Sequence, residues 1–98
     1  MEFKSFGIKV RGLRKKKGLL LRQIAAALEM DTALISKIER GERKANREQV
    51  IKLAEILNVE VEELLVIWLS DKIVDMLEKE PLAYKALKNS EKRIKNKY

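Results

Sequence analysis

The stretch LLLRQIAAALEMDTALISKIERG, residues 19–41, decides the fold of this chain. Its apolar residues recur at spacings of three and four, the period of an amphipathic helix, in two runs with a short turn between them. This pattern predicts one helix over Leu21–Leu28 and a second over Thr32–Arg40, and two short helices joined by a tight turn make a helix-turn-helix. The side chains expected to point inward are Ile24, Ala25, Leu28, Ile35 and Ile38.

The second helix of this pair has the features of a helix that enters the major groove of DNA. Asp31 stands at its N-cap position, its first turn carries no charge, and its exit is basic. The side chains left facing outward are Thr32, Ala33, Ser36 and Lys37. We therefore expect the chain to bind double-stranded DNA.

Several short motifs at fixed distances from this pair resemble a known family. They are Leu13-Arg14, Gly18-Leu19, Ile24-Ala25, the run ISKIERG at residues 35–41, Leu53-Ala54 and Leu57. Together they resemble the phage-repressor-like helix-turn-helix family, also called XRE or Cro/C1, over about residues 5–69. The resemblance implies an all-α fold with a five-helix lambda-repressor-like DNA-binding domain. It also implies a transcriptional regulator, in most relatives a repressor or dual regulator that acts as a dimer.

The resemblance assigns base contacts to the outward face of the second helix. The methyl groups of Thr32 and Ala33 can meet thymine methyls, Ser36 can donate or accept a hydrogen bond, and Lys37 can bond to guanine O6 and N7. The alternative is that these four residues are ordinary solvent-facing helix residues.

Basic residues around the pair are candidates for phosphate contact, the sequence-independent part of DNA affinity. Residues 37–52 hold six basic and three acidic side chains. A solvated charged surface is the competing interpretation. The phosphate-contact candidates are Arg22, Arg43, Lys44 and Arg47.

The resemblance also implies one structural ion pair, between Arg14 and Glu39.

The sequence departs from the family pattern at three places. Leu20 and Leu21 stand where relatives have a polar cap and a phosphate-binding glutamine, and Arg22 is the nearest residue that could replace this glutamine. Glu29 stands where the turn normally has glycine. Either its left-handed strain of roughly 1 kcal/mol is tolerated, or the preceding helix runs longer.

The rest of the chain is predicted to be helical. Helices are expected over Ser5–Lys17, with Gly18 as a left-handed C-cap, and from a capping box of Asn46 and Gln49 to about Leu57. Residues 61–79 form one long helix or two broken near Ser70, and a last helix covers Pro81–Lys95. The domain is expected at residues 1–69 and a C-terminal helical extension at residues 70–98.

The extension is a candidate dimerisation element, because its apolar residues exceed what one core face requires. Packing of the same residues on their own domain is the alternative, and the last helix can fold back, swap onto a partner or fray. The interface candidates are Trp68, Leu69, Ile73, Met76 and Leu77.

Composition excludes several function classes. The 98 residues hold no cysteine and no histidine, which argues against a zinc site, and we expect no metal, no cofactor and no enzyme activity. Asp71 and Asp75 lie one helical turn apart and are interpreted as a solvated face. No apolar run approaches the length of a membrane span, and a cytoplasmic protein without a membrane partner is expected.

The rival to a DNA-binding homodimer is an antitoxin-like or adaptor module. In that case the apolar helix after Glu60 binds another protein, and Leu20 and Leu21 favour this alternative.

The positive net charge of +7 lies mainly at the two ends of the chain, since residues 55–80 hold eight acidic and two basic side chains.

Overall fold

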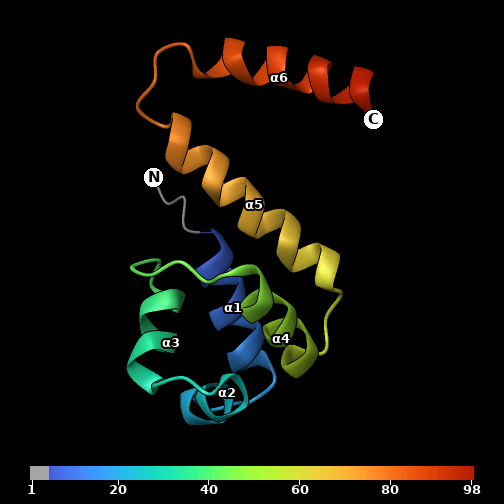
Figure 1. Ribbon diagram of the computed structural model, residues 1–98. Coiled ribbons are helices and arrows are strands. Elements are labelled where there is room, and N and C mark those ends of the chain that lie inside the picture. Colours follow the sequence, from blue (N-terminus) through green and yellow to red (C-terminus); the bar gives the residue numbers. More distant parts are fainter. Residues whose placement is uncertain (1–4) are drawn as a thin grey trace.

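The computed structural model describes residues 5–98, which form six α-helices and, within that range, no strand (Figure 1). The helices are α1 (Ser5–Lys16), α2 (Leu21–Leu28), α3 (Thr32–Glu39), α4 (Arg47–Leu57), α5 (Val61–Leu77) and α6 (Ala83–Lys97). The first four helices and the start of α5 form one body, from which α5 extends to carry α6 at its far end. Residues 1–4 of the predicted domain lie outside the described residues. No helix in the described part of the chain is long and apolar enough to cross a membrane.

The predicted all-α fold is confirmed, and the first four helices end within one residue of their predicted bounds. The open question about residues 61–79 is answered by one unbroken helix, since Ser70 donates its hydroxyl to the Val66 carbonyl, 2.7 Å away, without interrupting α5. The predicted domain boundary at residue 69 therefore falls inside a helix.

The predicted bounds of the last helix are wrong at both ends. Pro81 and Leu82 lie in a turn, in which the Ala83 amide donates to the Glu80 carbonyl at 3.0 Å. The helix consequently starts two residues after the proline and runs on to Lys97.

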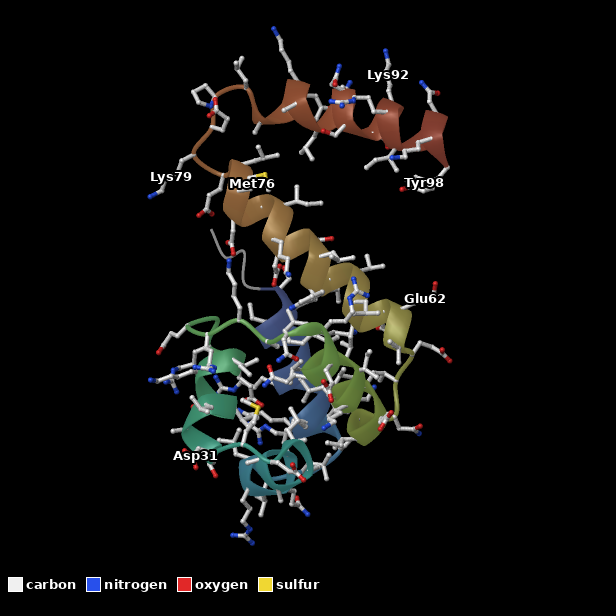
Figure 2. All side chains as sticks on the ribbon, in the orientation of Figure 1. Asp31, Glu62, Met76, Lys79, Lys92 and Tyr98 are labelled. Atoms are coloured by element: carbon white, nitrogen blue, oxygen red, sulfur yellow. The ribbon has the colours of Figure 1, made fainter. Side chains whose placement is uncertain are left out.

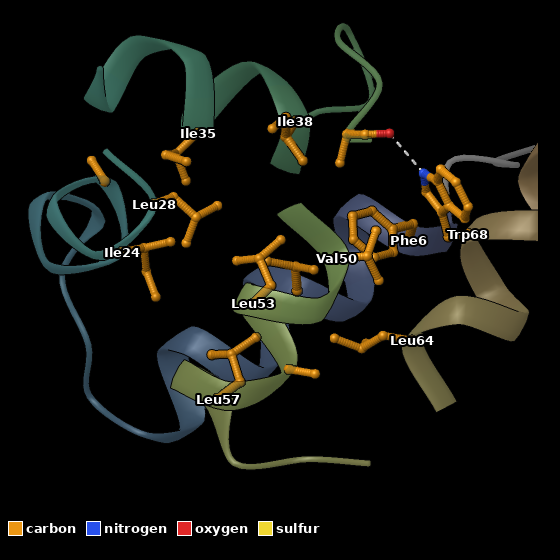
Figure 3. Close-up of a cluster of buried hydrophobic side chains, with 14 residues drawn as sticks. Phe6, Ile24, Leu28, Ile35, Ile38, Val50, Leu53, Leu57, Leu64 and Trp68 are labelled. Carbon is orange, nitrogen blue, oxygen red and sulfur yellow. Dashed lines mark hydrogen bonds between the residues drawn. The ribbon is translucent and has the colours of Figure 1, made fainter. Parts of the chain in front are cut away.

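The five side chains predicted to point inward are all buried, and they join residues from α1, α4, α5 and the α3–α4 loop in one core (Figure 3). The helix-turn-helix packs on α1 and α4, and α5 packs on the same two helices. This core consists of Phe6, Val10, Ile24, Ala25, Leu28, Ile35, Ile38, Ala45, Val50, Leu53, Ala54, Leu57, Leu64 and Trp68.

Of the two helix starts with a predicted cap, one is confirmed and the other is not. The capping box of α4 is confirmed, because the Gln49 amide donates to Asn46 Oδ1 at 2.8 Å and the Asn46 amide donates to Gln49 Oε1 at 2.9 Å. Asp31 occupies the N-cap position of α3 but accepts no cap hydrogen bond through its side chain, so its predicted capping role is wrong. Its extended backbone alone provides the entry to α3.

The turn between α2 and α3 tolerates a left-handed residue other than glycine. Glu29 has φ 55° and ψ 45°, and α2 ends at Leu28 as predicted. Of the two alternatives, the strained turn is therefore the one adopted. The amide of Met30 donates to the Ala25 carbonyl at 2.9 Å, which closes the end of α2.

The two aspartates of α5 are not the solvated face predicted for them. Asp71 accepts a hydrogen bond from the Phe6 amide at 2.9 Å, so a carboxylate from α5 satisfies an unpaired amide in the first turn of α1. Asp75 lies 3.7 Å from the ammonium group of Lys44 in the loop after α3. Both carboxylates are only partly exposed and tie α5 to the body.

Helix α1 lies close against the end of α3 at Gly7. A Cβ built on Gly7 would overlap the carbonyl oxygens of Ile38 and Glu39 at the end of α3. Gly12, in the same helix, would meet nothing within 4 Å. Only the first of these glycines is required for packing.

We expect Gly7→Ala to lower the free energy of unfolding by about 1–3 kcal/mol, because backbone atoms must move to admit the methyl group. The matched control Gly12→Ala should raise it by about 0.5–1 kcal/mol, since alanine loses less entropy in a helix. Urea unfolding followed by circular dichroism measures both. Equal effects of the two substitutions would contradict the close approach of α1 and α3.

Candidate nucleic-acid interface

Helix α3 lies at the edge of the body with one face buried and one face open (Figure 1). Ile35 and Ile38 anchor it in the core. On the other side, Thr32, Ala33 and Lys37 are exposed and Ser36 is half-buried. The four predicted base-contact side chains therefore share the outer side of α3.

An ion pair holds the last turn of α3 against α1. Arg14 Nε lies 2.7 Å from Glu39 Oε2, and Arg14 Nη2 donates to Glu39 Oε1 at 3.1 Å, so the pair is bidentate. The remaining Arg14 nitrogen, Nη1, donates to the Leu19 carbonyl at 3.0 Å. The hydrogen bonds that Arg14 donates to the Glu39 carboxylate raise the pKa of the Arg14 guanidinium above its usual value. This is the ion pair that the resemblance implied.

A second, exposed network lies at the end of α3 and was not foreseen. Arg40 donates through Nη1 to the Ser36 hydroxyl oxygen, and its Nε and Nη2 donate to the Glu42 carboxylate at 2.8 and 3.3 Å. The hydrogen bonds from the Arg40 guanidinium lower the pKa of Glu42 below its ordinary value. Because Ser36 accepts from Arg40, its own hydroxyl proton stays available for a further acceptor.

The sequence contained a signal for this network that the prediction did not use. Arg40 lies four residues after Ser36, which is one helical turn, and two residues before Glu42. The prediction counted Arg40 only as one charge in the basic cluster.

The four predicted phosphate-contact residues come from α2 and from the segment that follows α3. Arg22 and Arg43 are exposed, and Lys44 is 73% exposed at its side chain although it lies near Asp75. The Arg47 guanidinium lies 5.5 Å from the centre of the Trp68 ring, at the start of α4. All four charges are thus accessible from solvent.

Trp68 has to be removed from the interface candidates. Its side chain is buried in its own chain, and its indole Nε1 donates to the Ala45 carbonyl at 2.8 Å (Figure 3). A tryptophan held in this way supports the loop after α3 and is not available to a second molecule. The other four candidates, on α5, are exposed or half-buried.

A family comparison identifies the arrangement of α1 to α5. The model of the helix-turn-helix family HTH_3 matches residues 10–64, more than half of the chain. The chain belongs to this XRE-type helix-turn-helix family.

Individual relatives of this helix-turn-helix protein are also regulators. The chain is 33% identical over 64 residues to the uncharacterized HTH-type transcriptional regulator YazB of Bacillus subtilis (strain 168), across 65% of this chain and 93% of YazB. The crystal structure of the restriction-modification controller protein C.AhdI from Aeromonas hydrophila superposes with a TM-score of 0.59 at 34% identity, across 63% of this chain and 94% of C.AhdI.

Two structures of the clp gene regulator ClgR from Corynebacterium glutamicum are similar as well. One has a TM-score of 0.60 at 26% identity, across 67% of this chain and 86% of that one. The other has a TM-score of 0.61 across 94% of this chain and 87% of that one; at 22% identity it shows a shared fold alone. Together with the family match, these relatives make the chain a DNA-binding helix-turn-helix transcriptional regulator and not an enzyme.

We expect Glu39→Gln to lower the free energy of unfolding by about 3 kcal/mol, because it leaves the buried Arg14 guanidinium without its counter-charge. The matched control is Glu42→Gln, which removes an equal charge from the exposed pair with Arg40 and should leave stability unchanged. Chemical unfolding at neutral pH measures both variants. A small and equal effect of the two would show that the Arg14 pair does not hold α3 in place.

Proposed function

We propose that this regulator binds a palindromic operator as a homodimer, with α3 of each copy in the major groove, and acts as a repressor that also controls its own expression. The observation that carries this proposal is the outer side of α3. Small and polar side chains are presented there by a helix whose other face is fixed by Ile35, Ile38 and the Arg14–Glu39 pair.

The outer side chains of α3 supply the base contacts in this proposal. Lys37 bonds to guanine, and the Thr32 and Ala33 methyl groups contact thymine methyls. Ser36, whose oxygen accepts from Arg40, donates its proton to an acceptor on a base edge. These contacts read sequence, whereas contacts to the backbone do not.

Phosphate contacts come from Arg22, Arg43, Lys44 and Arg47. Lys44 supports this role through its exposed ammonium group, which is 3.7 Å from Asp75 and can exchange that long ion pair for a phosphate. Arg47 lies at the N-terminus of α4, where backbone amides also favour an anion.

The dimer in this proposal uses the exposed apolar face of α5. Leu69, Ile73 and Met76 are 41%, 44% and 77% exposed, which is a large uncovered area for one helix. A dimer held beyond the DNA-facing elements places two α3 helices on one face of DNA, so that the half-sites lie one helical turn or a multiple apart.

An antitoxin-like or adaptor module is the second candidate, and one observation favours it. Leu20 is 48% exposed at the start of α2, where the family pattern has a polar residue that supports phosphate binding. In this alternative, α5 and Leu20 contact a different protein. Size in solution separates the two candidates, since a stable homodimer favours the regulator and a monomer favours a missing partner.

Selection of binding sites from a randomised duplex pool, at low and moderate salt, tests the proposal. We expect a paired motif with half-sites about 10 base pairs apart or a multiple of that. Enrichment that is independent of sequence and disappears with salt would contradict it, because only electrostatic attraction would remain.

Two single substitutions then test the division of roles between base and phosphate contacts. Lys37→Ala should relax the base preference at one position of each half-site. Lys44→Ala should weaken all sequences about equally and reduce the slope of log affinity against log salt by roughly one per site. Competition binding with matched and mismatched operators measures both. If the two variants behave alike, the assigned roles are wrong.

A further inference from the structure

The uncovered hydrophobic surface of this protein is concentrated in its last two helices. Nine of the eleven large hydrophobic side chains that are exposed among the described residues come after Val61. The DNA-binding body contributes only Ile8 and Leu20. A surface patch of this kind marks a site of association.

On α5 these side chains form a narrow row. Val66, Leu69, Ile73 and Met76 follow one another at spacings of three, four and three residues, and all four are exposed. This is the two-in-seven pattern by which one helix packs along a single other helix. The opposite face of α5 is already used, since Leu64 and Trp68 are buried in the core.

A matching row lies on α6. It consists of four residues spaced by four, three and four positions: Ala83, Leu87, Ser90 and Ile94. The one polar member, Ser90, donates its hydroxyl to the Ala86 carbonyl at 2.8 Å, so it is satisfied within its own helix. The helix has no buried residue. An isolated helix of 15 residues is marginal in water, so packing against a partner would stabilise α6.

An open corner of the molecule lies between α5 and α6, and part of each row borders it. Figure 1 shows α6 turning away from the axis of α5, and in Figure 2 Lys92 and Tyr98 project from opposite sides of α6, with Tyr98 on the side of α5. A hollow of about 520 Å³ lies in this corner. It is lined by Ile73, Val74, Leu77, Ala83 and Leu87, together with the charged residues of the turn.

The turn holds the corner open. Glu80 accepts twice, from the Ala83 amide at its carbonyl and from the Leu82 amide at Oε1, 3.0 and 3.4 Å away. Pro81 fixes its own φ in the middle of this turn. The rows on α5 and α6 of one copy therefore stay apart, and each is free to pack against another chain.

Charge decides which helices pair. Helix α5 holds four acidic side chains and one basic one, and the turn after it adds Glu78, Lys79 and Glu80, whereas α6 holds six basic and one acidic. Pairing α5 with α5, or α6 with α6, would bring like charges together, but pairing α5 with α6 joins opposite ones. A second copy of this chain offers both helices, and a two-fold axis forms both contacts at once.

We propose that two copies exchange their C-terminal helices, so that α6 of each copy packs along α5 of the other in the open corner. This inference rests on the proposed homodimer and names its contact. The apolar rows form the centre of each helix pair, and the turn at Glu80 sets the angle between α5 and α6 of one copy. The acidic and basic side chains beside the rows favour the α5–α6 pairing over the two like-charged pairings.

Engineered cysteines test the exchange cleanly, because the chain has no cysteine of its own. Ile73→Cys and Leu87→Cys are prepared as separate single variants, one with a mass tag, then mixed and mildly oxidised. Each copy carries one thiol, so every disulfide is intermolecular. We expect at least about tenfold more mixed disulfide than in the control mixture of Ile73→Cys with Lys92→Cys, whose thiol lies on the outer side of α6.

Three outcomes overturn the inference and leave the DNA proposal standing. A dominant disulfide between two copies of Ile73→Cys would show α5–α5 pairing. A double variant of Ile73 and Leu87 that closes only within one chain would show that α6 folds back. A dimer by light scattering with no preference over the Lys92→Cys control would place the contact elsewhere. Failure of the operator proposal is separate, because it appears in the site selection.

Discussion

The contact between α1 and the last turn of α3 is the constraint on which the rest of this structure depends. It has two parts, the missing side chain of Gly7 against the carbonyls of Ile38 and Glu39, and the bidentate ion pair of Arg14 with Glu39. The absence of a side chain at Gly7 lets the two helices come close together. The ion pair fixes how α3 is rotated relative to α1, because a guanidinium donates its two parallel hydrogen bonds to a carboxylate in one plane. The outer side of α3 is therefore presented in one orientation, as reading a groove requires.

Helix α5 connects this body to the exposed C-terminal region. Its buried face contributes Leu64 and Trp68 to the core, and Trp68 also holds the Ala45 carbonyl of the loop after α3. One turn further on, Asp71 satisfies the Phe6 amide, and one turn after that Asp75 pairs with Lys44. The loop that carries two candidate phosphate contacts is thus attached to the same helix that carries the exposed apolar row. A change in the packing of α5 reaches that loop through one rigid element.

The departures from the family pattern lie at the entry and exit of α2, and those at Leu20 and Glu29 are compensated locally. Without a polar side chain at Leu20, the Leu20 amide donates to Gln23 Oε1 at 2.7 Å, so one unpaired group of the helix start is still satisfied. Glu29 accepts the left-handed conformation, whose cost of roughly 1 kcal/mol is small beside the burial of Leu28 in the core. The fold keeps its pattern although the usual residues are replaced.

The sequence by itself determined the features that depend on residues a few positions apart. These are the bounds of α1 to α4, the five inward side chains of the helix-turn-helix, the left-handed Gly18 and the capping box of Asn46 and Gln49. The periodicity of a helix and the geometry of its caps are local, so they can be read from the chain. The Arg14–Glu39 pair came from the resemblance, since nothing local connects residues 25 positions apart.

Only the tertiary structure decided the rest. Asp71 and Phe6 are 65 residues apart, and no spacing rule predicts that a carboxylate on α5 caps α1. Trp68 was among the predicted interface candidates, but its hydrogen bond to the Ala45 carbonyl, 23 residues away, holds it in the core of its own chain. The direction of α6 relative to α5 depends on the hydrogen bonds that Glu80 accepts from the amides of Leu82 and Ala83 in the turn between the two helices. In each case the deciding contact joins groups that only the folded chain brings together.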